Sequence, residues 1–170
     1  MSMYRFDEWM NSAYGHKLDF DIYLPKYNVN LQRPLVWTPI QKEQLIISLL
    51  RDVPMPRFVL VERVDDISGR RNPSTFLVLD GKQRMNTIFE FIRNEFSISY
   101  KEKQIFFDDL SNLAKQRITD PHPCTYDVHY SYPNDAISDD TLIYLFELVN
   151  FLGTPQDKQH LETLKKLQND

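Results

Sequence analysis

Residues Phe58–Ile92 read FVLVERVDDISGRRNPSTFLVLDGKQRMNTIFEFI, and their pattern predicts the fold class. Two runs rich in β-branched and aromatic residues, Phe58–Val64 and Thr75–Leu79, are typical of strands, and the polar loop between them favours a hairpin. The sequence Asp-Gly-Lys-Gln-Arg follows at once, and apolar residues then recur three and four positions apart, which predicts a helix. Strands that lead directly into a helix indicate a small α+β domain.

The segment before this stretch predicts a helix with a well-defined start. Thr38 is an N-cap residue, Pro39 suits the first helical position, and Gln41 completes a capping box. The prolines at 54 and 56 end that helix. Further elements are expected elsewhere: a helix at 4–13, a strand or extended arm at 19–31, strands at 96–100 and 105–107, a short helix at 108–118 capped by Asp108 or Asp109, a strand at 124–130, an apolar helix opening at Ser138, and a polar helix at 156–168.

The composition excludes several classes of protein. Among the 170 residues there is one cysteine, Cys124, which excludes a disulfide framework and a multi-cysteine zinc site. No apolar run approaches the roughly 18 residues of a membrane span. The first residues lack the charged and then apolar pattern of a signal peptide. We therefore expect a soluble cytoplasmic protein with no membrane partner.

The charge is distributed unevenly. The whole chain has a formal net charge of −4, yet residues 26–104 carry thirteen bases and nine acids, whereas residues 105–170 carry five bases and eleven acids. The middle of the chain is therefore suited to meet an anion, such as a phosphate or a nucleic-acid strand. Charges that are simply scattered over helices and loops are the alternative.

The strand, turn and helix around Gly81 predict a phosphate site. Backbone N–H groups at a helix N-terminus point outward, and the helix dipole favours an anion there. Gly81 lets the backbone approach a phosphate closely, Arg84 can hold two oxygens, and Gln83 can donate a side-chain N–H. Thr87 lies one turn further along the same side of the helix. The pattern of a P-loop is absent.

Asp80 is the candidate ligand for a metal at this turn. A carboxylate beside phosphates usually acts through a divalent cation such as Mg²⁺, or it positions a water molecule. The alternative is purely structural: Asp80 and Gln83 have capping-box spacing, so Asp80 would cap the helix while Lys82 and Arg84 lie on the surface.

A second candidate lies just before the capped helix. Arg33 and Trp37 stand four residues apart in an extended segment, where they could stack on a base or hold a phosphate. The alternative is a tryptophan packed under the helix, with the arginine in a salt bridge.

Four ordered motifs resemble the N-terminal domain family of GmrSD-type modification-dependent restriction endonucleases. That family shows Q-R-x-x-x-W, Q-x-x-x-L-I-x-S-[IL]-L, P-[ILM]-P and then D-G-Q-Q-R. The corresponding residues here are Gln32, Arg33 and Trp37, the run from Gln41 that includes Ser48, Pro54-Met55-Pro56, and Asp80–Arg84. A last piece, Phe146–Pro155, is similar to the family's F-x-R-L-N-x-G-G-T-P. The resemblance covers roughly residues 20–160.

The resemblance implies a fold and a site. The family is related to the ParB and sulfiredoxin-like fold, so a nucleotide-binding domain is expected at 1–135, with C-terminal helices at 136–170 packed on the same domain. Nucleotide hydrolysis in DNA restriction is attributed to the signature turn. The residues thereby implied at the phosphate site are Asp80, Gly81, Gln83 and Arg84, with Asp80, Gln83 and Arg84 in catalytic roles, Arg33 as a second anion contact and Asn150 as a polar contact from the C-terminal helix.

The departures from the family pattern bear on hydrolysis. Lys82 replaces a glutamine and adds positive charge, which suits phosphate binding. Leu148 stands where the family usually has an arginine, and Leu152 replaces a glycine. Because an arginine at a phosphate site stabilises the charge of the transition state, its loss makes hydrolysis less secure than binding.

The sequence and its resemblance to the family predict three alternative functions. The first is a stand-alone restriction-type domain that binds, and on the family's example hydrolyses, a nucleoside triphosphate with Mg²⁺ in DNA conflict between phage and bacterium. The alternative is a non-enzymatic module that binds DNA, a host protein or a partner protein. The third is a ParB-like nuclease. The H-N-H-type nuclease region of larger family members is not expected here, because the four histidines are widely scattered.

Overall fold

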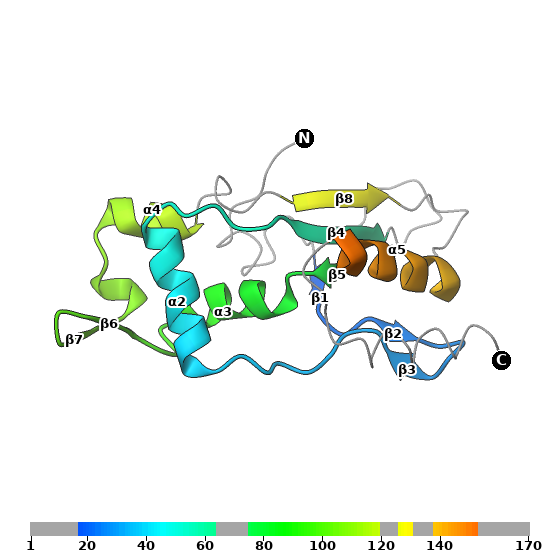
Figure 1. The fold of residues 1–170 in the computed structure, drawn as a ribbon, viewed down its shortest axis with the longest axis horizontal. Coiled ribbons are helices and arrows are strands. Elements are labelled where there is room, and N and C mark those ends of the chain that lie inside the picture. The colour runs from blue at the N-terminus through cyan, green and yellow to red at the C-terminus, as the bar shows by residue number, and fades with distance from the viewer. Residues whose placement is uncertain (1–16, 64–74, 120–125, 131–137, 153–170) are drawn as a thin grey trace. The chain divides into compact units, whose positions relative to one another are not determined.

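The computed structural model describes residues 17–63, 75–119, 126–130 and 138–152 (Figure 1). The chain forms two compact units, each assembled from separate segments. The described parts of the first, here called the helical unit, fall within Pro34–Phe58 and Gly81–Tyr126; those of the second, the sheet unit, fall within Gly15–Arg33, Val59–Asp80 and Asp127–Asp170. Helices and small sheets occur together, which confirms the α+β class; the ParB-like fold and the division at residue 135 stay predictions.

The sheet unit is built on a four-stranded sheet of order β1-β5-β4-β8. Its strands are β1 (Lys17–Asp19), β4 (Phe58–Arg63), β5 (Thr75–Asp80) and β8 (Tyr126–Tyr130). β4 and β5 pair antiparallel, as the hairpin prediction requires, with a register shift between Val59 and Leu60. β1 pairs parallel with β5, so β5 has a neighbour on each side.

One helix and a small hairpin complete the core of the sheet unit. α5 (Asp139–Leu152) packs against β5, and β2 (Tyr23–Leu24) pairs with β3 (Val29–Asn30). Nine buried apolar side chains from β4, β5, α5 and the β2–β3 hairpin with its flanks form one cluster: Ile22, Leu24, Leu31, Val61, Leu77, Leu79, Leu142, Ile143 and Phe146. Burial of apolar area on this scale is the main force that holds such a unit together.

The N-terminus of α5 is tied to the β2–β3 turn. Ser138 caps the helix, since its Oγ accepts the N–H of Thr141 at 3.1 Å. The Lys26 N–H donates to Asp139 Oδ2 at 2.7 Å, and the Lys26 Nζ donates to Asp140 Oδ2 at the same distance. The Tyr27 hydroxyl donates to the second oxygen of Asp140. The hydrogen bond from Lys26 is the main cause that lowers the pKa of Asp140.

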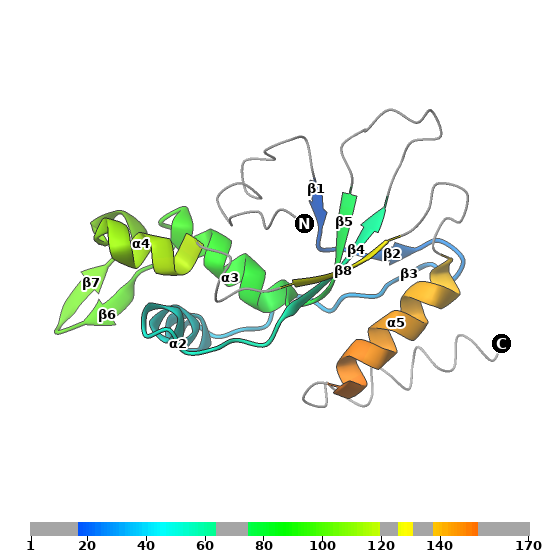
Figure 2. The same ribbon diagram turned by 90° about the horizontal axis from the view of Figure 1, so that it is seen from above.

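The helical unit is organised around α2 (Pro39–Leu50). It contacts α3 (Lys82–Ile92), α4 (Asn112–Thr119) and β6 (Ile98–Tyr100), which forms a hairpin with β7 (Lys103–Ile105) (Figure 2). The predicted capping box is confirmed: Thr38 Oγ1 accepts the Gln41 N–H at 3.3 Å, and Gln41 Oε1 accepts the Thr38 N–H at 2.9 Å. The buried apolar residues of the helices include Leu45, Ile46, Leu49, Met85, Ile88, Phe89, Phe91 and Ile118.

The prediction for the short helix after residue 107 was wrong at its start. Asp108 and Asp109 belong to a 3-10 turn, η2 (Phe107–Asp109), and α4 begins only at Asn112. Ser111 caps it, with its Oγ accepting the Ala114 N–H at 3.3 Å. The acids were unavailable as caps because Asp109 bonds the Phe106 N–H at 2.9 Å and Asp108 bonds Asn94 Nδ2 at 3.0 Å.

The β6–β7 hairpin is tighter than the sequence indicated. The strands expected at 96–100 and 105–107 leave residues 101–104 for the turn, yet only Lys101 and Glu102 lie between β6 and β7, with φ values of 48° and 66°. Left-handed backbone at both positions is the geometry of a two-residue hairpin, which Asn and Gly usually supply. The return strand therefore begins at Lys103 rather than Ile105.

Several expectations lie outside the described residues. These are the helix at 4–13, the polar loop at 65–74, the segment 153–155 and the helix at 156–168. Within the described ranges, no helix is both long and apolar enough to span a bilayer.

Candidate functional site

The signature Asp80-Gly81-Lys82-Gln83-Arg84 forms the turn between β5 and α3. Asp80 ends the strand, and Gly81 occupies the N-cap position of the helix with a φ of 101°. A Cβ atom on Gly81 would lie 2.2 Å from Cδ1 of Phe58. Both the positive φ and the packed ring require glycine here. The expectation that Asp80 caps the helix was wrong, because the strand continues through Asp80 and Gly81 takes the N-cap position.

The first turn of α3 carries basic residues and no side-chain cap. Its N-cap residue is a glycine, which has no side chain to cap the helix, and the first turn contains no acidic residue. It contains instead Lys82 and Arg84. α2 differs, since Thr38 and Gln41 satisfy its N-terminus. Backbone N–H groups together with a positive dipole end make such a turn attractive to phosphate.

Gln83 holds an extended segment against α3. Its side chain is 9% exposed. Its Oε1 accepts the N–H groups of Val36 at 3.0 Å and Trp37 at 3.3 Å, and its Nε2 donates to the Pro34 carbonyl at 2.8 Å. Both ends of the amide are thus occupied by backbone groups of the segment that carries Trp37.

Arg84 holds a second segment. Its Nη1 donates to the Pro56 carbonyl and its Nη2 to the Arg57 carbonyl at 3.3 Å. The guanidinium carbon lies 4.9 Å from the centre of the Phe58 ring, within cation–π range. Arg84 therefore fixes the chain that leaves the P-M-P motif, together with the ring beneath Gly81.

The other predicted residues of the helical unit differ in access. Thr87 is 1% exposed, and its Oγ1 donates back to the Gln83 carbonyl at 2.8 Å, so its hydroxyl is used within the helix. Lys82 is half-buried. Trp37 is also half-buried and lines a pocket, described below.

Three predicted residues belong to the sheet unit. Asp80 and Arg33 are half-buried there. Asn150 lies near the end of α5, and its side chain is outside the part of the chain that the structure describes. Gln32, next to Arg33, donates from Nε2 to the carbonyls of Val78 at 2.5 Å and Leu79 at 2.9 Å. Like Gln83, this motif glutamine binds backbone.

The described ranges contain no group of three or more His, Cys, Asp and Glu side chains that could hold a metal alone. Asp80 is a single carboxylate at the end of a strand. That suits Mg²⁺, which proteins commonly hold through one or two carboxylates together with substrate phosphates.

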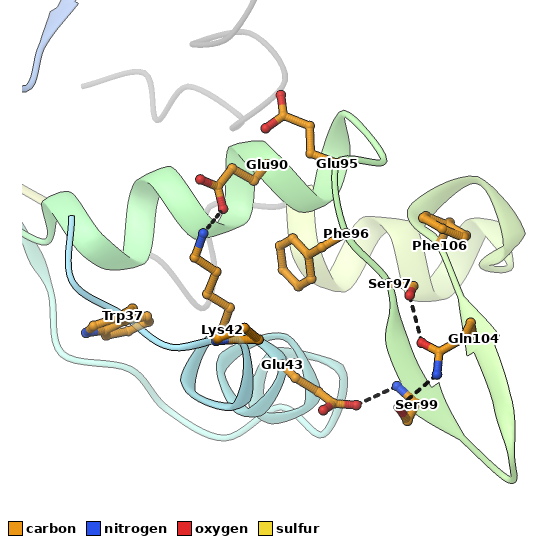
Figure 3. Close-up of a pocket in the computed structure, with 11 residues that line it drawn as sticks. Trp37, Lys42, Glu43, Glu90, Glu95, Phe96, Ser97, Ser99, Gln104 and Phe106 are labelled. Carbon is orange, nitrogen blue, oxygen red and sulfur yellow. Dashed lines mark hydrogen bonds and ion pairs between the residues drawn. The ribbon is translucent and has the colours of Figure 1, made fainter.

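Sequence reasoning missed a pocket of about 710 Å³ in the helical unit (Figure 3). We call it the hairpin pocket; its lining residues are Trp37, Pro39, Lys42, Glu43, Glu90, Glu95, Phe96, Ser97, Ser99, Gln104 and Phe106. They come from the start of α2, from α3, and from the β6–β7 hairpin with its flanks. Only Trp37 stood out in the sequence, because no spacing joins residues of such separate segments.

Comparison with known proteins gives one family. Residues 15–167 match the model of the GmrSD restriction endonuclease N-terminal domain. No curated protein and no solved structure shows a significant match to the chain.

Proposed function

Because the chain belongs to the family of GmrSD restriction endonuclease N-terminal domains, we propose that it binds a nucleoside triphosphate at the β5–α3 turn. The family places the chain in the context of restriction endonucleases, and the proposal adds the ligand. The observation that supports it is the first turn of α3, which has a glycine at the N-cap, no acidic residue and two basic residues.

The residues of the turn have distinct roles in this proposal. The backbone N–H groups after Gly81 and the ammonium of Lys82 hold phosphate oxygens. Arg84 lends its charge to the same turn while it holds the carbonyls of Pro56 and Arg57. Gln83 positions the segment with Trp37. Trp37, from the same unit as α3, is proposed to contact the nucleotide, and contacts from Arg33 and Asn150 stay what the family resemblance implies.

Asp80 is the proposed ligand for Mg²⁺. A bound Mg²⁺ would neutralise phosphate charge, and the Asp80 carboxylate at the strand end would orient it or a water molecule. Thr87 contributes by bracing the helix, since its hydroxyl already donates to the Gln83 carbonyl.

The contacts of the turn favour nucleotide binding over nucleotide hydrolysis. The amide of Gln83 is occupied at both ends, and the guanidinium of Arg84 already donates to two carbonyls. Leu148 stands on α5 at the position of the family arginine and is 40% exposed. Few side chains are then available to stabilise the extra charge of a transition state.

The test is equilibrium binding of labelled ATP and GTP, with Mg²⁺, to the purified protein. Lys82→Ala is expected to weaken binding roughly tenfold, the usual effect of losing one charge-assisted contact. Lys17→Ala removes the same charge from an exposed position on β1 and should leave affinity unchanged. Asp80→Ala should abolish the contribution of Mg²⁺. A wild-type protein that binds neither nucleotide would overturn the proposal, and phosphate release measured in parallel separates hydrolysis from binding.

A second candidate function is DNA binding without a nucleotide. The observation that favours it is the tip of the β6–β7 hairpin, where Tyr100 is 61% exposed beside exposed Lys101 and Lys103. Such a tip can meet the phosphate backbone. Shift assays at low salt should show binding that falls with salt and weakens in Lys101→Ala/Lys103→Ala, with Lys17→Ala as the control. Incubation of plasmid with Mg²⁺ or Mn²⁺ tests the nuclease alternative.

A further inference from the structure

The hairpin pocket carries an inference that does not depend on nucleotide binding. Its volume of about 710 Å³ lies within the range of roughly 300–1,000 Å³ that ligand sites occupy. Four parts of the helical unit meet around it: the approach to α2, α2 itself, α3, and the hairpin with its flanks. The signature turn contributes no residue to its lining.

The lining is acidic. It contains three carboxylates, those of Glu43, Glu90 and Glu95, against one ammonium, that of Lys42, which gives a formal net charge of −2. Lys42 Nζ lies 2.5 Å from Glu90 Oε2, so these two charges offset one another (Figure 3). Glu90 Oε1 accepts from Asn86 at 2.7 Å. The uncompensated charge is therefore that of Glu43 and Glu95.

Each of these two carboxylates is only partly engaged. Glu43 Oε1 accepts the Ser99 N–H at 2.5 Å, which leaves its second oxygen for a further donor. Glu95 Oε1 lies 3.9 Å from Arg93 Nη1, and both side chains are about half exposed. An ion pair at that distance and exposure is weak. A cationic ligand would therefore find two carboxylates to bind.

The rest of the lining suits a planar ligand group that donates hydrogen bonds. Trp37, Phe96 and Phe106 supply aromatic rings, which attract cations to their faces. Ser97 Oγ donates to Gln104 Oε1 at 2.7 Å, and Gln104 Nε2 donates to Ser99 Oγ at 3.2 Å. The Ser97 hydroxyl and one N–H of Gln104 are thus used within the wall, and the acceptor oxygens that remain on Glu43 and Glu95 suit a ligand rich in N–H groups.

We infer that the hairpin pocket binds a guanidinium group. Guanidinium is planar, carries five N–H donors and no acceptor, stacks on aromatic rings and pairs with carboxylates. An ammonium group would pair with the carboxylates but would interact less fully with the aromatic rings. The carboxylates would repel a phosphate group. The group could come from an arginine side chain of a partner protein or from free arginine, and the two sources share the same chemistry.

The test uses fluorescence of Trp37 in the Trp9→Phe variant of the 170-residue chain, in which Trp37 is the one remaining tryptophan. The probes are an acetylated and amidated Gly-Arg-Gly peptide, the same peptide with citrulline, and free arginine. Citrulline keeps the shape of the side chain and removes its charge. We expect the arginine peptide to change the emission saturably at low salt and the citrulline peptide to bind at least about tenfold more weakly.

Matched variants locate the binding. Glu43→Gln and Glu95→Gln should each weaken the arginine peptide several-fold, whereas Glu102→Gln, the same change at the exposed hairpin tip, should not. Glu95 is half exposed, so its variant should fold even if the Glu43 variant does not. If free arginine binds with the same affinity as the arginine peptide, the ligand is a small molecule. If only the peptide binds, the ligand is an arginine side chain of a partner protein. Equal affinity for the citrulline peptide, unchanged affinity in both variants, or no response to any arginine probe would overturn the inference.

Discussion

At the scale of single residues, Gly81 and Phe58 determine the shape of the signature turn. We predict that Gly81→Ala lowers the free energy of unfolding by about 2–4 kcal/mol, since the new Cβ meets the Phe58 ring at 2.2 Å and the φ of 101° is strained for alanine. Chemical denaturation measures the loss. In a Phe58→Leu background the steric part should be smaller. A single variant as stable as the wild type would show that the turn is looser than described.

Gln83 supports a second prediction. Gln83→Ala removes an amide that bonds the backbone at Pro34, Val36 and Trp37. Each hydrogen bond contributes about 0.5–1.5 kcal/mol, so the loss of these partly buried bonds should lower the unfolding free energy by roughly 2–4 kcal/mol. Gln44→Ala, at an exposed position of α2, is the control and should cost little. If both variants lose the same stability, the hydrogen bonds of Gln83 are not the cause.

The location of the turn could be predicted from sequence, but the partners of its side chains could not. A strand followed by Asp-Gly and an amphipathic helix is a local pattern, so the sequence predicts where the turn lies. The acceptors of Gln83 and Arg84 are backbone carbonyls 49 and 28 positions earlier in the chain. Every residue has the same backbone carbonyl group. The pattern of side chains in the sequence therefore does not indicate which carbonyl accepts each hydrogen bond.

At the scale of elements, the N-terminus of α5 has a testable pH dependence. Hydrogen bonds from Lys26 and then Tyr27 lower the pKa of Asp140 below its ordinary value of 3.8. A carboxylate with a lower pKa in the folded state stabilises it above the unfolded pKa, and this contribution is lost as pH falls through the folded pKa.

The stability difference between wild type and Asp140→Asn should therefore be constant near neutral pH and shrink below about pH 4. Thermal unfolding of both proteins across that range measures it. A difference that persists unchanged in acid would mean that Asp140 does not act through its charge.

Elements with complete local signals were predicted best. The helix α2 starts where Thr38, Pro39 and Gln41 place it, because a capping box acts within four residues. The start of α4 was missed because several acids and a serine compete for the cap, and contacts to Asn94 and Phe106 decide among them. The Lys101-Glu102 turn contradicts its own sequence preference, so the pairing of β6 with β7 imposes it.

At the scale of the whole molecule, the units are assembled from separate segments, and α5 is essential to one of them. Leu142, Ile143 and Phe146 supply a third of the nine buried residues in the sheet-unit core. Burying a large apolar side chain contributes about 1.5–3 kcal/mol, and a domain has only about 5–15 kcal/mol in total.

We therefore predict that a chain ending at residue 137 does not form a stable sheet unit, as judged by the loss of its cooperative unfolding transition. Phe146→Ala should cost about 3–5 kcal/mol. Leu148→Ala, at a position 40% exposed on the same helix, should cost much less. A well-folded chain of 137 residues would show that the helix is an appendage.

The interleaved order of the units is the part of the fold that the sequence did not reveal. Composition and periodicity describe continuous stretches of sequence. Each unit here, however, consists of segments that are separated along the chain by residues of the other unit. The predicted boundary at residue 135 divides the chain into continuous stretches, and it stays a prediction.

The amide bonds of Gln83 also have a consequence for exchange with solvent. The N–H groups of Val36 and Trp37 precede α2 and bond a side chain from α3, so their exchange with deuterium requires those bonds to open. Trp37 lines the hairpin pocket and Gln83 belongs to the signature turn. The amide protons of Val36 and Trp37 can therefore report on ligand binding. A ligand bound in the hairpin pocket or at the signature turn should slow their exchange with deuterium.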